Sequence, residues 1–409
     1  MEVFVARQPI FNRRFNVHAY ELLFRSGLQN YVDFDDGDRA TLDVIRNSFF
    51  YIGLEELTDH KQVFVNFTSN LLLKGVPTLF PSNVMIIEIL ENVEPTKEIL
   101  DACKALKQSG YTLALDDFIL SDKKNPLIEF ADIIKVDFRE STNAQQDAIL
   151  DLGRTHRIKF LAEKVETSKE FKRAREAGYA FFQGYFFSKP VIRSGRSIPA
   201  FKLNYMKMLQ EVNRADVDFS DMERIIKRDL AMTYKLMRFI NSAYFGVLEQ
   251  VNSIKRALVL LGIDEIKKWI SFIALDNMAQ DKPNELIKTS VVRARLCENI
   301  AMQVGLDDYA AEAFLMGMFT VIDAIMDKPM REILPQLALA DEIKNALTGK
   351  ENRFKHILDL VLAYERGEWD DFSRLSEITD FSESEMPKIY NDGLKWTEQI
   401  FEVKNTAVS

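Results

Sequence analysis

Short apolar runs rich in β-branched and aromatic residues alternate with longer segments of helical period along the first half of the chain. The longer segments, such as residues 97–110 and 145–156, carry apolar residues at helical spacing and close with glycine or polar residues. Repeated strand–helix units predict a parallel sheet, and eight runs over about 190 residues predict a closed β/α barrel. The runs span residues 2–10, 17–24, 62–68, 84–90, 112–118, 132–138, 158–165 and 179–187.

The chain changes character at residues 188–201, a stretch with proline, glycine and serine that is typical of a domain boundary. Beyond it, as in residues 226–240, apolar residues recur at helical spacing. A single core stops growing at roughly 250–300 residues, so a chain of 409 residues favours two domains. We expect an α/β barrel over residues 1–200 and an all-helical domain over residues 201–409.

The bulk composition excludes several classes of protein. A formal net charge of −9 and a pI near 5.3 indicate no basic face, so DNA is not an expected partner. The two cysteines, Cys103 and Cys297, lie far apart and form no metal-ligand motif, which is typical of a reducing compartment. The first residues lack the pattern of a signal peptide, and no apolar run is long enough to span a bilayer. We therefore expect a cytoplasmic protein without a membrane span.

Polar residues recur near the carboxyl ends of the predicted strands. In a β/α barrel these ends converge on one face, where active sites are built. Because nearly every run shows the pattern, it predicts one shared polar site rather than independent strand ends. Its members are Glu21, Asn66, Glu88, Asp116, Asp117, Lys135, Glu163 and Gln183.

Two adjacent carboxylates interrupt the run TLALDDFIL, residues 112–120. A charge in an apolar setting is costly unless it is paired or binds a metal, and Asp116 and Asp117 repel each other. Side chains alternate across a strand, so the two could share a site only where the strand becomes a loop, predicted from Phe118 onwards. Hard cations such as Mg²⁺ or Mn²⁺ prefer all-oxygen sets, and so many acids predict a two-metal site.

Two-metal sites serve phosphoester hydrolysis because the ions activate water and stabilise the attacking and leaving oxygens. In such a site Lys135 would balance charge or position the attacking water. Arg25, four residues beyond Glu21, could bind a substrate phosphate bidentately. The sequence has no GxxxxGK(S/T) motif, which argues against NTP hydrolysis by a phosphate-binding loop.

Seven motifs occur in a fixed order along this half of the chain. They are YELLFR (20–25), VNFT (65–68), EILE (88–91), LDDF (115–118), IKVD (134–137), AEKVET (162–167) and QGYFFSKP (183–190). Together they resemble the motifs of EAL domains, bacterial phosphodiesterases that linearise cyclic di-GMP. The resemblance implies a modified TIM barrel whose first strand runs antiparallel. It also implies cyclic di-GMP as ligand, Mg²⁺ or Mn²⁺ as cofactor and a homodimer formed through this domain.

The resemblance also implies a role for each matched residue. Asp117 would hold the second metal, and Glu163 would help to complete the metal site. The implied ligands of the first metal are Glu21, Asn66, Glu88 and Asp116. The implied catalytic residues are Glu21, Glu163 and Lys135. Lys135 would contact the catalytic water. The remaining roles are phosphate binding for Arg25, substrate positioning for Gln183 and tethering of the loop after the aspartates for Glu166.

Three departures from the family pattern bear on activity. Glu21 is followed by Leu22 rather than alanine, an exchange of apolar residues. Ile-Leu-Ser at residues 119–121 replaces a glycine-containing loop, and Lys164 replaces a glycine. Glycine permits positive φ and close approach to a ligand. Three hypotheses stay open: an active phosphodiesterase, a cyclic di-GMP receptor without turnover, and a protein-interaction scaffold.

The second half contains LAMTYKLMRFINSAYFG (230–246) and SIKRALVLLGIDEIKKW (253–269), which resemble the HDOD domain, an all-α relative of the HD phosphohydrolases. HD enzymes need several His and Asp ligands, whereas this half has Thr320 and Val321 where a His-Asp pair would stand. The resemblance implies a regulatory module without metal chemistry that binds an unidentified protein partner. Asn241 is expected to bond to neighbouring backbone rather than to a ligand.

Overall fold

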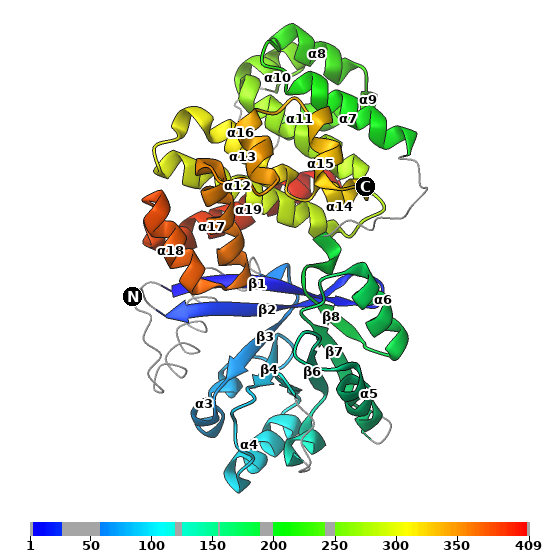
Figure 1. Cartoon of the computed structure of the whole chain (residues 1–409), viewed down its shortest axis with the longest axis vertical. Coiled ribbons are helices and arrows are strands. Elements are labelled where there is room, and N and C mark those ends of the chain that lie inside the picture. The colour runs from blue at the N-terminus through cyan, green and yellow to red at the C-terminus, as the bar shows by residue number, and fades with distance from the viewer. Residues whose placement is uncertain are drawn as a thin grey trace. The chain divides into compact units, whose positions relative to one another are not determined.

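The computed structural model of the chain describes residues 3–26, 58–118, 125–153, 156–188, 199–241 and 250–406. The chain divides into two compact units, drawn in Figure 1. The first unit contains Met1–Lys189 and the short segment Tyr364–Trp369, and the second contains Pro190–Ala363 and Asp370–Ser409.

Eight strands form a closed barrel in chain order in the first unit. They are β1 (Val3–Asn12), β2 (Val17–Ser26), β3 (Gln62–Phe67), β4 (Met85–Ile89), β5 (Thr112–Leu115), β6 (Ile133–Asp137), β7 (Lys159–Glu163) and β8 (Phe181–Gln183). Strands β2 to β8 run parallel, whereas β1 is antiparallel to both of its neighbours, β2 and β8. The predicted barrel with an antiparallel first strand is therefore confirmed.

Helices cover the outside of the barrel, as Figure 1 shows. Each begins directly after a threonine whose side-chain oxygen accepts a hydrogen bond from a backbone N–H of the first turn. Two of these threonines, Thr142 and Thr167, form complete capping boxes. The helices described in this unit are α3 (Ser69–Leu73), α4 (Lys97–Gln108), α5 (Asn143–Leu152) and α6 (Ser168–Ala177).

One buried apolar residue from each strand joins a single cluster, which we call the apolar layer. Side chains from all eight strands can meet only inside a closed barrel, so this layer fills the interior. Small and large residues share the space, since two are alanines and two are phenylalanines. The layer consists of Ile10, Ala19, Phe64, Ile86, Ala114, Ile133, Leu161 and Phe181.

Strands β5 and β8 end three and four residues earlier than their sequence runs predicted. Strand β5 stops at Leu115, before both aspartates, and Asp117 has a φ of 37° that turns the backbone away from the strand direction. Strand β8 has only three residues, because Gly184 ends it with a φ of 129° and Tyr185–Ser188 continue as a 3-10 helix.

The described chain from Ala200 onwards contains helices and no strand. Helix α13 crosses α12 at Gly317, where an added Cβ would lie 2.4 Å from the Arg293 carbonyl oxygen. None of the described helices is long and apolar enough to cross a membrane. The α-helices are α7 (Ala200–Val212), α8 (Phe219–Lys227), α9 (Leu230–Ile240), α10 (Ile254–Leu261), α11 (Ile263–Met278), α12 (Asn284–Gln303), α13 (Ala310–Phe319), α14 (Ile322–Met326), α15 (Met330–Ile333), α16 (Asp341–Leu347), α17 (Arg353–Arg366), α18 (Trp369–Thr379) and α19 (Met386–Thr406).

Replacing Gly184 by alanine should destabilise the barrel. A Cβ at this position would lie 2.2 Å from the carbonyl oxygen and 2.6 Å from the nitrogen of Val165, and both are backbone atoms. The clash adds to the strain of alanine at positive φ, so Gly184→Ala should cost more than about 1 kcal/mol. Gly178→Ala is the matched control, because its φ is 112° but no atom lies within 4 Å of the added Cβ. Thermal unfolding of the full chain should show the larger fall in Tm for Gly184→Ala, and equal Tm values would contradict this account.

Candidate active site

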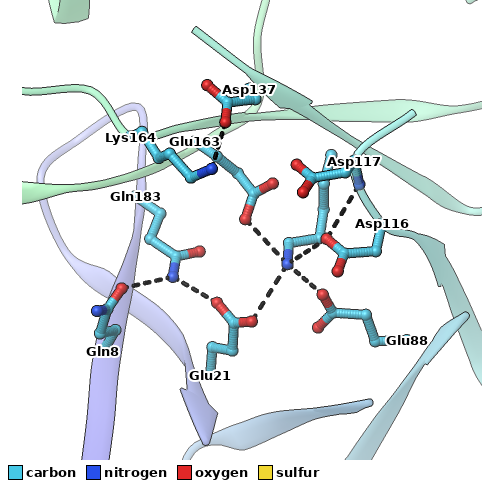
Figure 2. Close-up of polar contacts among 10 residues, drawn as sticks. Gln8, Glu21, Glu88, Asp116, Asp117, Asp137, Glu163, Lys164 and Gln183 are labelled. Atoms are coloured by element: carbon cyan, nitrogen blue, oxygen red, sulfur yellow. Dashed lines mark hydrogen bonds and ion pairs between the residues drawn. The ribbon is translucent and has the colours of Figure 1, made fainter. Parts of the chain in front are cut away.

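The ammonium of Lys135 lies at the centre of the polar strand ends. Its Nζ contacts Asp116 Oδ1 at 2.9 Å, Glu163 Oε1 at 2.9 Å, Glu21 Oε1 at 3.3 Å and also Glu88 Oε1. Lys135 is 1% exposed and Glu88 is fully buried. Figure 2 shows the four carboxylates converging on this one ammonium. One cation among four acids leaves the cluster with an excess of negative charge.

The alternation of side chains along a strand explains why these residues meet. On every parallel strand the site residue follows the member of the apolar layer by two positions, as Glu21 follows Ala19 and Lys135 follows Ile133. Residues two apart point to the same face and lie about 7 Å apart along the strand. A polar layer therefore stands next to the apolar layer inside the same barrel, at the carboxyl ends of its parallel strands.

The adjacent aspartates share the site because the strand ends before them. The backbone N–H of Asp117 donates a hydrogen bond to Asp116 Oδ1 at 3.0 Å. Carboxylate oxygens of Asp116, Asp117 and Glu163 lie within 4.8 Å of one another. The predicted change from strand to loop thus occurs, but it begins at Asp116 rather than at Phe118.

Gln183 links the acidic cluster to the antiparallel strand. Its Nε2 donates hydrogen bonds to Glu21 Oε2 and, at 3.0 Å, to Gln8 Oε1. Sequence reasoning overlooked Gln8, because it tracked the carboxyl ends of the runs and β1 runs in the opposite direction. Gln8 precedes Ile10 of the apolar layer by two positions, and this spacing of two was the signal that could have identified it.

The buried acids compete for too little positive charge. Burial raises the pKa of Glu88 and raises that of Glu163 to about 8, although Lys135 opposes both shifts. Burial would also raise the pKa of Asp116, but the contact with Lys135 lowers it below the usual value. Burial would lower the pKa of Lys135, yet the surrounding carboxylates raise it, so the ammonium stays charged at neutral pH.

The donor set fits a hard divalent cation. The triad of Asp116, Asp117 and Glu163 supplies oxygen ligands only, and Mg²⁺ and Mn²⁺ prefer such sets. Glu88 Oε2 is buried and accepts no hydrogen bond within the described residues, so it is available to a cation. In the same part of the chain this triad is the only group of three His, Cys, Asp or Glu side chains with ligand atoms this close together.

Asp137 and Lys164 form an ion pair beside the triad, and sequence reasoning did not predict it. Asp137 follows Lys135 by two positions on β6 and is 6% exposed. The ammonium of Lys164 contacts Asp137 Oδ2, as Figure 2 shows. Burial would raise the pKa of Asp137, but hydrogen bonds from Lys164 and from the Arg139 and Glu140 backbone lower it. The repeat of polar residues at positions 135 and 137 was the available signal.

The remaining residues predicted for the site are Asn66, Arg25 and Glu166. Asn66 is half-buried on β3 and pairs in register with Glu88 on β4, so its backbone borders the cluster. Arg25 belongs to β2, but its side chain lies outside the described residues. Glu166 Oε2 forms an ion pair with Arg139 at 2.7 Å. The loop that Glu166 was expected to tether, residues 119–124, is also outside the described residues.

In the second unit Asn241, the residue after α9, bonds to the backbone of Met237 and Val251. Its Nδ2 donates to the carbonyl oxygens of Met237 at 2.8 Å and Val251 at 2.9 Å, and its Oδ1 accepts from Val251 N–H at 2.7 Å. This is the expected bonding to neighbouring backbone.

Asp323 is the acid near Thr320 and Val321, the positions of the missing His-Asp pair. Burial raises the pKa of Asp323 to about 6. Its Oδ1 accepts a hydrogen bond from Ala324 N–H at 2.8 Å, and Thr320 Oγ1 accepts one from Arg293 at 3.3 Å. These contacts account for the local polar groups without a ligand.

The fold and site together define the first unit as a TIM-like barrel with an acidic, oxygen-only cluster at the carboxyl ends of its strands. Two family models match the sequence, the EAL domain at residues 50–190 and the HDOD domain at residues 198–348. The chain belongs to the family of proteins that join an EAL domain to an HDOD domain. The EAL match begins after β2, so Glu21 and Arg25 precede it.

Two relatives align over nearly the whole chain. Uncharacterized protein YuxH of Bacillus subtilis (strain 168) is 39% identical over 99% of this chain and 100% of its own length. Cyclic di-GMP phosphodiesterase CdgJ of Vibrio cholerae is 34% identical over 97% of this chain and 93% of its own. Among solved structures, Klebsiella pneumoniae BlrP1 in complex with manganese and cyclic di-GMP is 22% identical, covering 46% of this chain and 55% of its own, with a TM-score of 0.37.

Replacing Asn241 by alanine should destabilise the second unit by about 1–3 kcal/mol, because Val251 N–H and two carbonyl oxygens lose their partner. Asn213→Ala is the matched control, since Asn213 directly follows α7 and its Nδ2 donates to the carbonyl oxygen of Leu209, one turn earlier. Urea unfolding of the full chain should show the larger loss for Asn241→Ala. A loss no larger than that of the control would show that the bonds of Asn241 to Val251 do not stabilise the second unit.

Replacing Asp323 by asparagine should stabilise the chain above pH 6. The folded-state pKa of about 6 lies above the unfolded value of 3.8, so the native state binds the proton more tightly and stability falls as pH rises between these values. Asparagine keeps the acceptor for Ala324 without the buried charge, so the gain at pH 7 should reach up to about 3 kcal/mol. Urea unfolding at pH 4 and pH 7 measures it, with exposed Asp308→Asn as control. A gain that is equal at both pH values would contradict the titration of Asp323.

Proposed function

We propose that the first unit is a metal-dependent phosphodiesterase that hydrolyses cyclic di-GMP to linear pGpG. The observation that carries the proposal is the cluster of four carboxylates around Lys135, two of which also belong to the triad of Asp116, Asp117 and Glu163. Membership of the EAL–HDOD family supports the same substrate, because the relative CdgJ is described as a cyclic di-GMP phosphodiesterase.

The residues assigned to metal binding follow from the donor set. Asp116, Asp117 and Glu163 would hold one Mg²⁺ or Mn²⁺ ion, and Glu21, Asn66, Glu88 and Asp116 would hold another, with Asp116 shared. When bound, the ions would activate water and stabilise the charge that develops on the phosphodiester. Burial, and after it the neighbouring carboxylates, raises the pKa of Glu88 and Glu163, and the bound ions would offset this negative charge.

Lys135 would act as a donor and not as a base. Its raised pKa keeps the ammonium protonated, so it can donate hydrogen bonds to the attacking water or to a phosphate oxygen but cannot accept a proton. Gln183 holds Glu21 through its amide and would keep this carboxylate oriented. From its sequence position, Arg25 would bind a phosphate of the substrate.

The proposed reaction adds one water to the cyclic dinucleotide. The water oxygen forms a bond to phosphorus, the bond from phosphorus to a ribose 3′ oxygen breaks, and this oxygen receives a proton. The product is a linear dinucleotide with one terminal phosphate and one free 3′ hydroxyl group.

A cyclic di-GMP receptor without turnover is the second candidate. The observation that favours it is Lys164, a charged residue at a position where the family has glycine, which lies beside the triad. The second unit would then report ligand binding. Whether the first unit is an enzyme or a receptor, we assign to the second unit a regulatory or protein-binding role. The bonds of Asn241 to backbone atoms are consistent with this role. We also propose a homodimer formed through the first unit.

Replacing Glu21 by glutamine tests the proposed function. The variant keeps the size of the side chain but loses the charge, so hydrolysis of cyclic di-GMP by the full chain should fall by more than the roughly 10- to 100-fold typical of outer-shell residues. Linear product is measured by chromatography with Mg²⁺ and with Mn²⁺ separately. Exposed Glu94→Gln is the matched control and should retain wild-type turnover.

The outcomes separate the two candidates. Turnover in the wild type that is lost in Glu21→Gln supports the enzyme. Tight binding of cyclic di-GMP without turnover in either metal would make the protein a receptor. Wild-type rates in Glu21→Gln would refute the role of Glu21.

A further inference from the structure

Lys164 occupies a backbone conformation that favours glycine. Its φ is 51°, in the left-handed region where a side chain is strained. It directly follows Glu163, whose side chain faces the cluster. In a continuing strand the next side chain would face away from the barrel interior. The positive φ ends the strand and lets the Lys164 side chain turn back toward the site, as Figure 2 shows.

The turned side chain has a defined partner. The Lys164 ammonium forms an ion pair with the buried carboxylate of Asp137. The other oxygen of Asp137 accepts hydrogen bonds from the backbone N–H groups of Arg139 at 2.5 Å and Glu140 at 3.1 Å. Asp137 is therefore held in place, and the ammonium stays beside the acidic cluster although 53% of the Lys164 side chain is exposed.

The charge of Lys164 reaches the triad. Burial and the neighbouring Asp116 raise the pKa of Asp117, and Lys164 opposes this shift. Lys164 is thus a second positive charge next to the site, after Lys135. The two ammoniums differ in their partners, because Lys135 contacts Glu21, Glu88, Asp116 and Glu163 and Lys164 contacts Asp137.

We propose that Lys164 is a resident countercharge that weakens divalent cation binding at Asp116, Asp117 and Glu163. The inference rests on the proposed function, in which these residues hold a cation. The ammonium acts in two ways: it repels a further positive charge, and it keeps the Asp137 carboxylate in an ion pair beside the triad. Lys164 therefore raises the concentration of divalent cation that is needed to occupy the triad. A glycine at this position has no charge and could not have this effect.

Cation binding without nucleotide tests this inference directly. Mn²⁺ is titrated calorimetrically into the full chain and into three variants at position 164. Lys164→Gln removes the charge and keeps a long side chain, so Mn²⁺ should bind about tenfold more tightly at the triad. Lys164→Arg keeps the charge and should bind Mn²⁺ as the wild type does. Lys164→Gly removes charge and backbone strain together and should match Lys164→Gln.

The same substitution in a second variant, Asp117→Asn, tests whether the change in Mn²⁺ affinity arises at the triad. In Asp117→Asn, which lacks one carboxylate of the triad, the further change Lys164→Gln should no longer tighten Mn²⁺ binding by this factor. Circular dichroism of each variant confirms that it is folded before titration.

The possible failures are distinguishable. Equal affinities of the wild type and Lys164→Gln would overturn the inference and leave the proposed metal site intact. Tighter binding by Lys164→Gly alone would assign the effect to backbone strain and overturn the role of charge. A gain that persists in Asp117→Asn would place the effect elsewhere. No Mn²⁺ binding by any of these proteins would overturn the proposed metal site and the inference with it.

Discussion

The contact between the Lys135 ammonium and buried carboxylates is the interaction on which the first unit depends. A buried charge is costly without partners, and the loss of one partner leaves the other uncompensated. Lys135 on β6 receives carboxylates from β2, β4 and β7 and from the residue after β5. These carboxylates reach Lys135 only because the strands are arranged in this order around the barrel, so the strand order determines the composition of the site. The apolar layer provides the packing, and the polar layer next to it provides the chemistry.

Charge imbalance, rather than burial of charge, distinguishes this cluster. The second unit also contains an ion-pair network with two buried members, Lys268 and Glu298. Lys268 contacts Glu298 and Glu265, and Arg295 contacts Glu298 at 2.6 Å. There, two bases face two acids, so the charges within the network balance. Around Lys135 the acids outnumber the base, and burial, together with the neighbouring carboxylates of Asp116 and Glu21, raises the pKa of Glu163. In the proposed function, a divalent cation would supply the positive charge that the protein side chains do not.

Two residues with positive φ let consecutive side chains approach the same site, which a regular strand does not allow. A strand alone presents every second side chain to the barrel interior. Asp117 and Lys164 each follow an interior-facing acid directly, and each has a φ between 37° and 51°. At both places the turn of the backbone brings consecutive side chains to the same region, one as a further acid and one as a cation. In the proposed metal site, the first would add a ligand and the second would weaken cation binding.

The sequence by itself determined the presence of eight strands, the helical second half and the polar residues that follow the apolar layer on the parallel strands, because the period of side chains follows from backbone stereochemistry within a short segment. It also indicated the backbone bonds of Asn241. Only the tertiary structure decided which side chains meet. Gln8 escaped prediction because β1 reverses direction, so its polar residue precedes the apolar layer. The pair of Asp137 and Lys164, the early end of β5 and the short β8 also escaped, since they depend on positive φ and on packing between strands far apart in the chain.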